Sequence, residues 1–537
     1  MKMTKKFLAV LLAMTMVMSM AACGGSKPAA SAAPAAPATP AAPTASAEPA
    51  APAAPAEKKV KETLTVTLSG EPTSLNPHFV GQLNAYIVDM LIYDTLLLKA
   101  PDGSFLPNIA TEWKEIDDTH IQFKLRDDVS FSNGKKMTAE DVLFTIKCLT
   151  ESATTKSTYQ YFDAANSKAV DEYTIELALK QPFAAVYNFL THPYSSIVCK
   201  SHYEEVGSDE YGINPVGTGA YTLEKWTSGS SILLKRKDNY WGEKGASPYV
   251  NVKFIAEAAN RTIELETGGT DIALDISTTD APRVESSDKM NLVTIPSYRA
   301  SFIAMNQSKP EFADKRIGQA LSLATDTKTL AEVAYAPYGT VADSVVSAAI
   351  AEHRSTGEHE YNPEKAKQLL AEAGYPNGIT LSGRCQTIAD FKVIAEIAQN
   401  MWKQAGINLE VQVLDKASYS ELGKTNGGTH ITITSQTATT GDVYQALGSM
   451  YSTTSTTGIF NSSDTHLESL IQEAAGTYDD AKRAERYGEI QEYIVGNYFA
   501  IPVGYNQILY GVSNQVQDFV ASPANTPNLK YTFAYEG

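Results

Sequence analysis

A period of two in the apolar residues predicts β-strands in several parts of the chain. The pattern is carried by TLTVTLS at 63–69, IQFKL at 121–125, YTIELALK at 173–180 and INLEVQVL at 407–414. In the last of these segments every second residue from Ile407 to Val413 is apolar, so we expect one buried face.

Other segments carry the start and stop signals of helices. Asn362 and Pro363 open one helix, which Gly374 closes. Thr138, followed three residues later by Asp141, opens another with an acidic capping box. A third helix is expected from about residue 389 to residue 404. The residues expected to face inward in the first and third helices are Ala366, Leu369, Leu370 and Ala373, and Phe391, Ile394, Ala395, Ala398 and Trp402. Because strands and helices alternate, the predicted fold class is α/β.

The first 60 residues follow neither pattern. Three lysines precede an apolar stretch that is too short to span a bilayer, which predicts an export signal over residues 1–22. The junction MAACG at 20–24 resembles the bacterial lipoprotein box, which implies a lipid on Cys23. Residues 23–60 are almost entirely Ala, Pro, Ser and Thr, a composition typical of an extended tether. We therefore expect the protein outside the cytoplasm, anchored to the outer face of the cell membrane.

The net charge and the cysteines bear on the possible partners and on disulfide bonds. The formal net charge is −17, and removing residues 1–22 deletes three lysines and no acidic residue, which gives −20. Such acidity argues against a nucleic-acid partner. Beyond Cys23, Cys148, Cys199 and Cys385 remain, and one pair of them could form a disulfide, although the spacing does not say which.

Seven segments in order along residues 63–510 resemble one family, the extracytoplasmic solute-binding proteins of ABC importers in the peptide and nickel cluster, often called family 5. They are GEPTSLNPHF at 70–79, IYDTLLLKAPDGSFLPNIATEWKEIDD at 92–118, FKLRDDVSFSNGKKMTAEDVLFT at 123–145, NPVGTGAYTLEKW at 214–226, LLKRKDNYWG at 233–242, FADKRIGQALSLATD at 312–326 and YNPEKAKQLLAEAGY at 361–375. Order and spacing together carry the resemblance, since any one segment alone would be weak.

The resemblance implies a periplasmic-binding-protein-like bilobed clamshell of type II, or cluster C, with an extra subdomain in lobe I. Lobe I would comprise residues 61–105, 211–304 and 501–537, the subdomain residues 106–210, and lobe II residues 305–500. The chain would cross between the lobes near ASFIAMNQ at 300–307 and near FAIPVGYNQ at 499–507. Two crossings make a hinge that closes over a ligand.

The segment TSQTATTGDVYQAL at 434–447 is where the resemblance bears on the ligand. Many peptide-binding members carry a tryptophan here and, a few residues later, an aspartate that pairs with the α-amino group of the ligand. Gln436 and Thr439 stand at those positions in this chain. The run from Thr440 to Tyr444 instead resembles a T-G-D-x-Y variant found in glutathione-binding-like members.

That variant implies that Asp442, with Tyr444 next to it, binds the amine. Asp442 is also well placed to cap the helix that follows it, because an aspartate at that position accepts from backbone N–H groups. Thr439 and Thr440 are expected to line the mouth of the cleft with their hydroxyl groups. For Asp442 both readings remain open at this point.

Three further residues are candidate ligand contacts. In dipeptide-binding members an arginine close to the position of Arg384 takes the carboxylate of the ligand, and the guanidinium fork suits that contact. Arg299 and Asn306 lie at the first proposed crossing. Asn306 could hold a hinge or pocket hydrogen bond. A structural ion pair for Arg299 and a strand cap for Asn306 are the alternatives.

The sequence contains little that resembles a metal site or a catalytic motif. The histidines are scattered, and His353 and His359 share a charged segment expected at the surface, so we expect no metal and no cofactor. Ser132 and Lys135 fit the S-x-x-K pattern of penicillin-recognising enzymes, but they follow a predicted hairpin rather than open a helix. We therefore expect no catalytic activity.

The sequence favours a monomeric, lipid-anchored binding protein that captures a short peptide between two lobes and delivers it to an ABC permease. Within the family, another small solute such as a nickel chelate, an opine or a sugar is the alternative. Outside that role, a ligand-sensing surface protein and a cell-wall enzyme remain as less favoured interpretations.

Overall fold

The computed structural model describes residues 59–79, 81–100, 103–425, 428–453, 455 and 457–537. Contacts divide the chain into Met1–Glu57 and Lys58–Gly537, and the second unit is described here by itself. The predicted export signal, Cys23 and nearly all of the tether lie outside the described residues. None of the described helices is long and apolar enough to cross a membrane.

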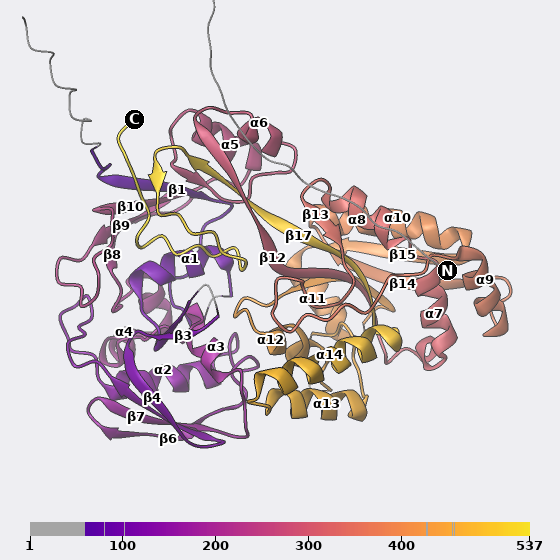
Figure 1. The fold of residues 1–537 in the computed structure, drawn as a ribbon, viewed down its shortest axis with the longest axis horizontal. Helices are drawn as coiled ribbons and strands as arrows, with labels where there is room; N and C mark the ends of the chain where they lie inside the picture. The colour runs from indigo at the N-terminus through magenta and orange to yellow at the C-terminus, as the bar shows by residue number, and fades with distance from the viewer. Residues whose placement is uncertain (1–58, 80, 101–102, 426–427, 454, 456) are drawn as a thin grey trace, which may run out of the picture. The chain divides into compact units, whose positions relative to one another are not determined.

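Two long antiparallel strands, β12 (Met290–Met305) and β17 (Ala500–Ser513), form the middle of an eleven-stranded sheet. Beyond β17 the order is β11 (Ile272–Ala273), β1 (Thr63–Leu68), β10 (Tyr249–Phe254), β9 (Ser231–Arg236) and β8 (Tyr221–Thr227). Beyond β12 it is β16 (Ile431–Thr437), β14 (Ile379–Gln386) and β15 (Ile407–Leu414), while β13 (Gly339–Val341) pairs with β17. We call these two sides the β1 half and the β14 half (Figure 1).

Helices cover both halves of this sheet. The β1 half carries α1 (Leu83–Ile92), α5 (Ala258–Glu266), α6 (Ala281–Glu285), the small pair β2 (Leu97–Lys99) and β3 (Phe105–Pro107), and the C-terminal pair β18 (Val516–Gln517) and β19 (Phe533–Ala534). The β14 half carries α7 (Lys315–Leu323), α8 (Thr327–Tyr335), α9 (Pro363–Glu372), α10 (Ala389–Gln404), α11 (Lys416–Lys424), α12 (Val443–Tyr451), α13 (Thr465–Ala475) and α14 (Asp480–Gly496).

A separate four-stranded sheet follows β3 in the chain, and with its helices we call it the β4 layer. Its strand order is β4 (Ala110–Asp117), β5 (His120–Leu125), β7 (Thr174–Leu179) and β6 (Phe162–Asp171). Its helices are α2 (Ala139–Glu151), α3 (Val186–Leu190) and α4 (Lys200–Ile213), the last kinked at Gly207.

The predicted strands and helices are confirmed, because their signals are local. α9 is capped by Asn362, whose side chain accepts from the N–H of Lys365, and α2 begins with the predicted capping box at Thr138. All five inward residues predicted for α10 are buried. One detail is wrong: Val413 is 46% exposed, because β15 is the outer strand of the sheet and its end is uncovered.

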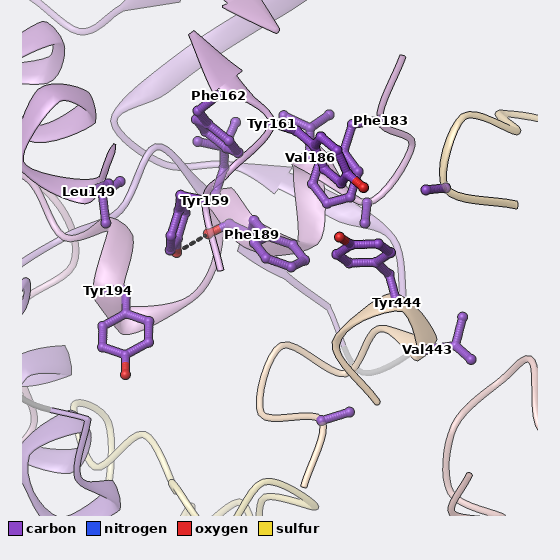
Figure 2. Packing of buried hydrophobic residues seen from close by; sticks show 14 of the residues in the cluster. Leu149, Tyr159, Tyr161, Phe162, Phe183, Val186, Phe189, Tyr194, Val443 and Tyr444 are labelled. Carbon is purple, nitrogen blue, oxygen red and sulfur yellow. Dashed lines mark hydrogen bonds between the residues drawn. The ribbon is translucent and has the colours of Figure 1, made fainter. Parts of the chain in front are cut away.

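The largest hydrophobic core joins the β4 layer to the C-terminal helices. Figure 2 shows its aromatic centre, where Tyr161, Phe183 and Phe189 of the β4 layer surround Tyr444 of α12. The ring centroid of Tyr444 lies 4.9 Å from that of Phe183 and 5.7 Å from that of Tyr161. Aromatic packing of this kind favours edge-on and offset geometries at such distances. The β4 layer and the β14 half therefore share a continuous apolar interior.

The possible disulfide among the three remaining cysteines does not form. Cys148, Cys199 and Cys385 are all free thiols. Cys199 and Cys385 are buried, and burial raises the pKa of Cys385. Buried thiols of this kind behave as small apolar side chains.

Candidate functional site

Small-ligand sites are typically cavities of roughly 300–1,000 Å³. One of ≈ 740 Å³ lies where the two halves of the sheet meet. Its described wall consists of Lys99, Ala100, Gly103, Ile295, Tyr298, Ala348, Ala349, Ile350, Ala351, His353, Gly441, Val520, Ala521 and Pro523. Lys99 and the lining residues at 100, 103 and 520–523 belong to the β1 half, and Tyr298 lies on the middle strand β12. The lining residues at 348–353 and Gly441 come with the β14 half. The cavity is therefore walled by both halves.

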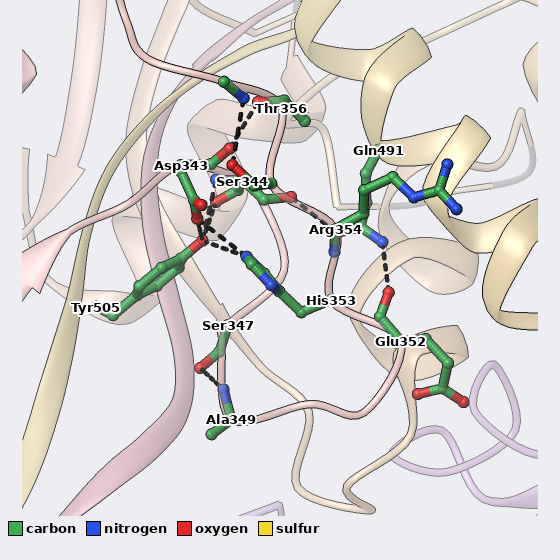
Figure 3. A network of polar contacts seen from close by, with 12 residues as sticks. Asp343, Ser344, Ser347, Ala349, Glu352, His353, Arg354, Thr356, Gln491 and Tyr505 are labelled. Atoms are coloured by element: carbon green, nitrogen blue, oxygen red, sulfur yellow. Dashed lines mark hydrogen bonds and ion pairs between the residues drawn. The ribbon is translucent and has the colours of Figure 1, made fainter. Parts of the chain in front are cut away.

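One side of the cavity is formed by a long connection between β13 and α9 that contains no helix or strand. Figure 3 shows how hydrogen bonds hold it in place. The hydroxyl of Tyr505 donates to Asp343 Oδ1 at 2.9 Å, and Gln491 Oε1 accepts from Ser344 Oγ at 2.8 Å and from the N–H of Arg354 at 2.9 Å. Long ordered loops of this kind are commonly functional. The tip, residues 348–351, reaches the cavity with three alanines and Ile350.

Buried charges lie directly behind the cavity wall. Arg483 of α14 donates to both carboxylate oxygens of Asp442, at 2.7 and 2.9 Å, and also pairs with Glu352. The side chains of Arg483 and Asp442 are 8% and 1% exposed. Asn188 of α3 donates to the second oxygen of Asp442 at 2.7 Å. Because each charge is paired, the cluster satisfies the condition under which buried ions are tolerated.

Lys99 connects this cluster to the cavity. Its ammonium donates to Asn188 Oδ1 at 2.6 Å and to the carbonyl oxygen of Gly441 at 3.3 Å. Burial lowers the pKa of Lys99, and the nearby charges of Asp442 and Glu352 oppose that effect. The contact with Gly441 joins the β1 half to the β14 half.

Asp442 caps α12, as one of the two readings of the sequence predicted. Its Oδ1 accepts from the N–H of Tyr444 at 2.8 Å. With Arg483 and Asn188 added, both of its oxygens are engaged by protein donors. The cavity wall next to it is Gly441, whose φ of +67° suits glycine. A Cβ at Gly441 would lie 3.0 Å from Nζ of Lys99, so a side chain there would crowd the cavity.

Thr439 and Thr440 hold the same turn. The N–H and hydroxyl of Thr440 donate to Gln445 Oε1, at 2.8 and 3.0 Å. His192 accepts from the N–H of Tyr194 at its Nδ1, so in the neutral ring Nε2 carries the proton and donates to Thr439 Oγ1 at 2.9 Å. Burial lowers the pKa of His192 to about 3, which keeps the ring neutral. Neither threonine is among the residues that line the cavity.

The remaining predicted residues lie apart from the cavity. Arg384 is fully buried in the β14 half, where its guanidinium donates to the carbonyl oxygens of Tyr419 and Gly458. Arg299 pairs with Asp390 at 2.7 Å, and Asn306 donates to the carbonyl oxygen of Thr429. The contact of Arg299 is the structural ion pair that the sequence allowed as an alternative, and the contact of Asn306 is a hydrogen bond within the protein. Tyr444 faces the aromatic core and accepts from Gln160 Nε2 at 3.0 Å.

The sequence did not single out Lys99, Tyr298 or the tip at 348–351, and it named His353 only in the search for metal ligands. The one available signal was the length of the connection between residues 341 and 363, which carries no strand or helix pattern. A neighbouring cavity of ≈ 840 Å³ shares Ala348 and His353 with the cavity of ≈ 740 Å³ and includes Asp343 and Tyr505. Among the residues that the structure describes, no group of three or more His, Cys, Asp or Glu side chains is arranged to hold a metal ion.

Comparisons with known proteins bear on this arrangement. The profile described as "Bacterial extracellular solute-binding proteins, family 5 Middle" matches residues 104–458. The glutathione-binding protein GsiB of Shigella boydii serotype 4 is 28% identical over 474 residues, which cover 86% of this chain and 92% of GsiB.

Two solved structures share the fold. DppA from Helicobacter pylori, in complex with the peptide STSA, has a TM-score of 0.77 at 22% identity and covers 89% of this chain and 99% of its own. A dipeptide-binding protein from Pseudoalteromonas sp. SM9913, in complex with Met-Leu, has a TM-score of 0.79 at 19% identity and covers 88% of this chain and 100% of its own. The fold is therefore the bilobed α/β fold of periplasmic binding proteins.

Proposed function

Because the chain belongs to the bacterial extracellular solute-binding proteins of family 5, we propose that it captures a short peptide between its two lobes and delivers it to an ABC permease. The β1 half and the β14 half are the lobes of this fold. The protein is a binding protein of a transport family rather than an enzyme. Its ligand would select the closed arrangement, which the permease then recognises.

The observation that carries this proposal is the cavity of ≈ 740 Å³ walled by both lobes. Its volume lies within the range typical of small-molecule sites, roughly 300–1,000 Å³. The names of GsiB and of the two solved structures support a peptide, since they describe glutathione, the peptide STSA and Met-Leu as ligands of those proteins. Asp442 and its neighbours were first predicted to touch the ligand. They would then act indirectly, because they position Gly441 in the cavity wall.

A thermal-shift screen of residues 58–537, the unit that contains the described cores, tests the peptide proposal. Dipeptides, tripeptides and glutathione are compared with nickel chelates, opines and sugars. We expect at least one peptide to raise the unfolding temperature, because a ligand at 100 times its Kd stabilises a protein by about 2.7 kcal/mol. Stabilisation by a non-peptide solute alone would contradict the peptide as ligand while leaving the family role intact.

We also propose that a lipid on Cys23 anchors the protein to the outer face of the membrane, with residues 24–60 as the tether. Replacing Cys23 with Ser removes the thiol that carries the lipid. The Cys23→Ser variant is expected to leave the membrane fraction and to lose incorporation of labelled fatty acid. Membrane association equal to that of the unchanged protein would exclude this anchor.

A further inference from the structure

Among the described residues of the cavity wall the charges are one-sided, although the chain as a whole is strongly acidic. The formal net charge is −17, yet the described wall residues include Lys99 and His353 and no Asp or Glu. The rest of the described wall is mainly apolar, with Ile295, Ile350 and Val520 among its members. A ligand that fills this cavity therefore meets a cation and apolar surface, and the described wall offers no acidic side chain to a free ammonium group.

Among the described residues, Lys99 has fewer hydrogen-bond acceptors than N–H donors. An ammonium group has three N–H donors, and two acceptors of Lys99 are described, Asn188 Oδ1 at 2.6 Å and the carbonyl oxygen of Gly441 at 3.3 Å. Both acceptors are uncharged. The nearest carboxylates, Asp442 and Glu352, are instead engaged by Arg483. Lys99 is thus held by neutral groups of the β4 layer and of the β14 half, and its ammonium group adjoins the cavity.

Lys99 is half-buried, and a cation partly withdrawn from water without a direct ionic partner is destabilised, so a bound anion relieves part of that cost. Burial lowers the pKa of Lys99, which is the expected response to this environment. A carboxylate from the ligand would supply the missing charge through a charge-assisted hydrogen bond. Hydrogen bonds to charged groups contribute about 1.5–3 kcal/mol, which corresponds to roughly 10–150-fold in affinity.

We propose that Lys99 binds a carboxylate group of the ligand, so that the protein recognises an acid end and does not require a free amine. For a peptide this group is the C-terminal carboxylate. The inference rests on the proposed function, because it assigns a specificity contact within the same cavity. It also explains how the site operates with Gln436 and Thr439 where many peptide-binding relatives carry tryptophan and aspartate.

Matched ligands test the proposal by calorimetry on residues 58–537. Trialanine is compared with trialanine amide, which lacks the carboxylate, and with N-acetyl-trialanine, which lacks the ammonium. We expect amidation to weaken binding at least tenfold and acetylation to change it less than threefold. The reverse order, or equal losses, would overturn the assignment.

Three variants connect this preference to Lys99. Lys99→Met should bind trialanine and its amide equally, whereas Lys99→Arg, which keeps the charge, should still prefer the acid. Lys328→Met is the matched control, because Lys328 is an exposed lysine of the neighbouring cavity and should leave the preference unchanged. If Lys99→Met retains the preference, or if Lys328→Met removes it, Lys99 is not the carboxylate contact.

The design separates failure of this inference from failure of the proposed function. Peptide binding without acid preference overturns the role of Lys99 alone. If no peptide binds, the proposed peptide function fails, and the same comparison is made with an N-(carboxyethyl)amino acid and its amide. Absence of acid preference in that pair, or of any binding, overturns the inference as well.

Discussion

Replacing Arg483 with Met is expected to lower the free energy of unfolding by about 3–5 kcal/mol, since removing one partner of a buried ion pair leaves an uncompensated charge. Two carboxylates depend on this one guanidinium, Asp442 and Glu352. Urea unfolding of residues 58–537 at pH 7 measures the difference between the variant and the unchanged protein. A loss below about 1 kcal/mol would show that the cluster is not stabilised by Arg483.

Arg486, one turn further along α14, provides the matched control. It pairs with Glu473 at 3.3 Å, and both side chains are well exposed, at 41% and 58%. Exposed pairs contribute about 0–1 kcal/mol, so Arg486→Met should change stability little. The comparison separates the effect of burial from the effect of losing an arginine on the same helix.

The loss caused by Arg483→Met should depend on pH. Burial already raises the pKa of Glu352, although the charge of Arg483 opposes this effect. Without Arg483, the folded state of the variant favours the protonated form of Glu352 further, so the pKa of Glu352 exceeds its value in the unfolded chain. The folded variant then binds more protons than the unfolded chain above about pH 4, and its stability falls as the pH rises. The gap from the unchanged protein should therefore be wider at pH 7 than at pH 4.5.

Replacing Tyr444 with Ala is the second change with a large expected effect. Tyr444 is 2% exposed and fills the aromatic centre shared by the β4 layer and α12 (Figure 2). Removing a large buried aromatic side chain costs about 3–5 kcal/mol, because a cavity replaces the packed ring. We expect that loss in urea unfolding, together with weaker ligand binding, since these contacts also hold the β14 half against the β4 layer.

Tyr444→Phe separates packing from hydrogen bonding. The ring remains, and only the hydroxyl that accepts from Gln160 is lost. The expected cost is about 1 kcal/mol, with ligand affinity close to that of the unchanged protein. Equal losses for the Ala and Phe variants would show that the hydroxyl, rather than the ring, provides the stabilisation.

Local signals explain how much of the fold the sequence predicted. α9 and α10 follow from capping residues and apolar stripes that lie within the elements themselves. The pairing of β12 with β17 is different, because it joins Ile303 to Ile501 across almost 200 residues of chain. No periodicity within either strand encodes that partner, and only the resemblance to a family indicated where the chain would cross.

The candidate site shows the same limit. Asp442 carries a clear capping signal, but its buried partner Arg483 lies 41 residues further along the chain. Lys99 follows three leucines and resembles the polar end of an ordinary strand. Its neighbour in space, Gly441, is 342 residues away, so the position of Lys99 at the cavity arises only from the tertiary structure.

A crystal structure of residues 58–537 with a stabilising peptide tests most directly whether the solute is captured between the two lobes. The account predicts the peptide in the cavity between Lys99, Tyr298 and Gly441, in contact with both halves of the sheet. A peptide bound instead in the neighbouring cavity around Asp343, or on the outer surface of one lobe, would contradict it.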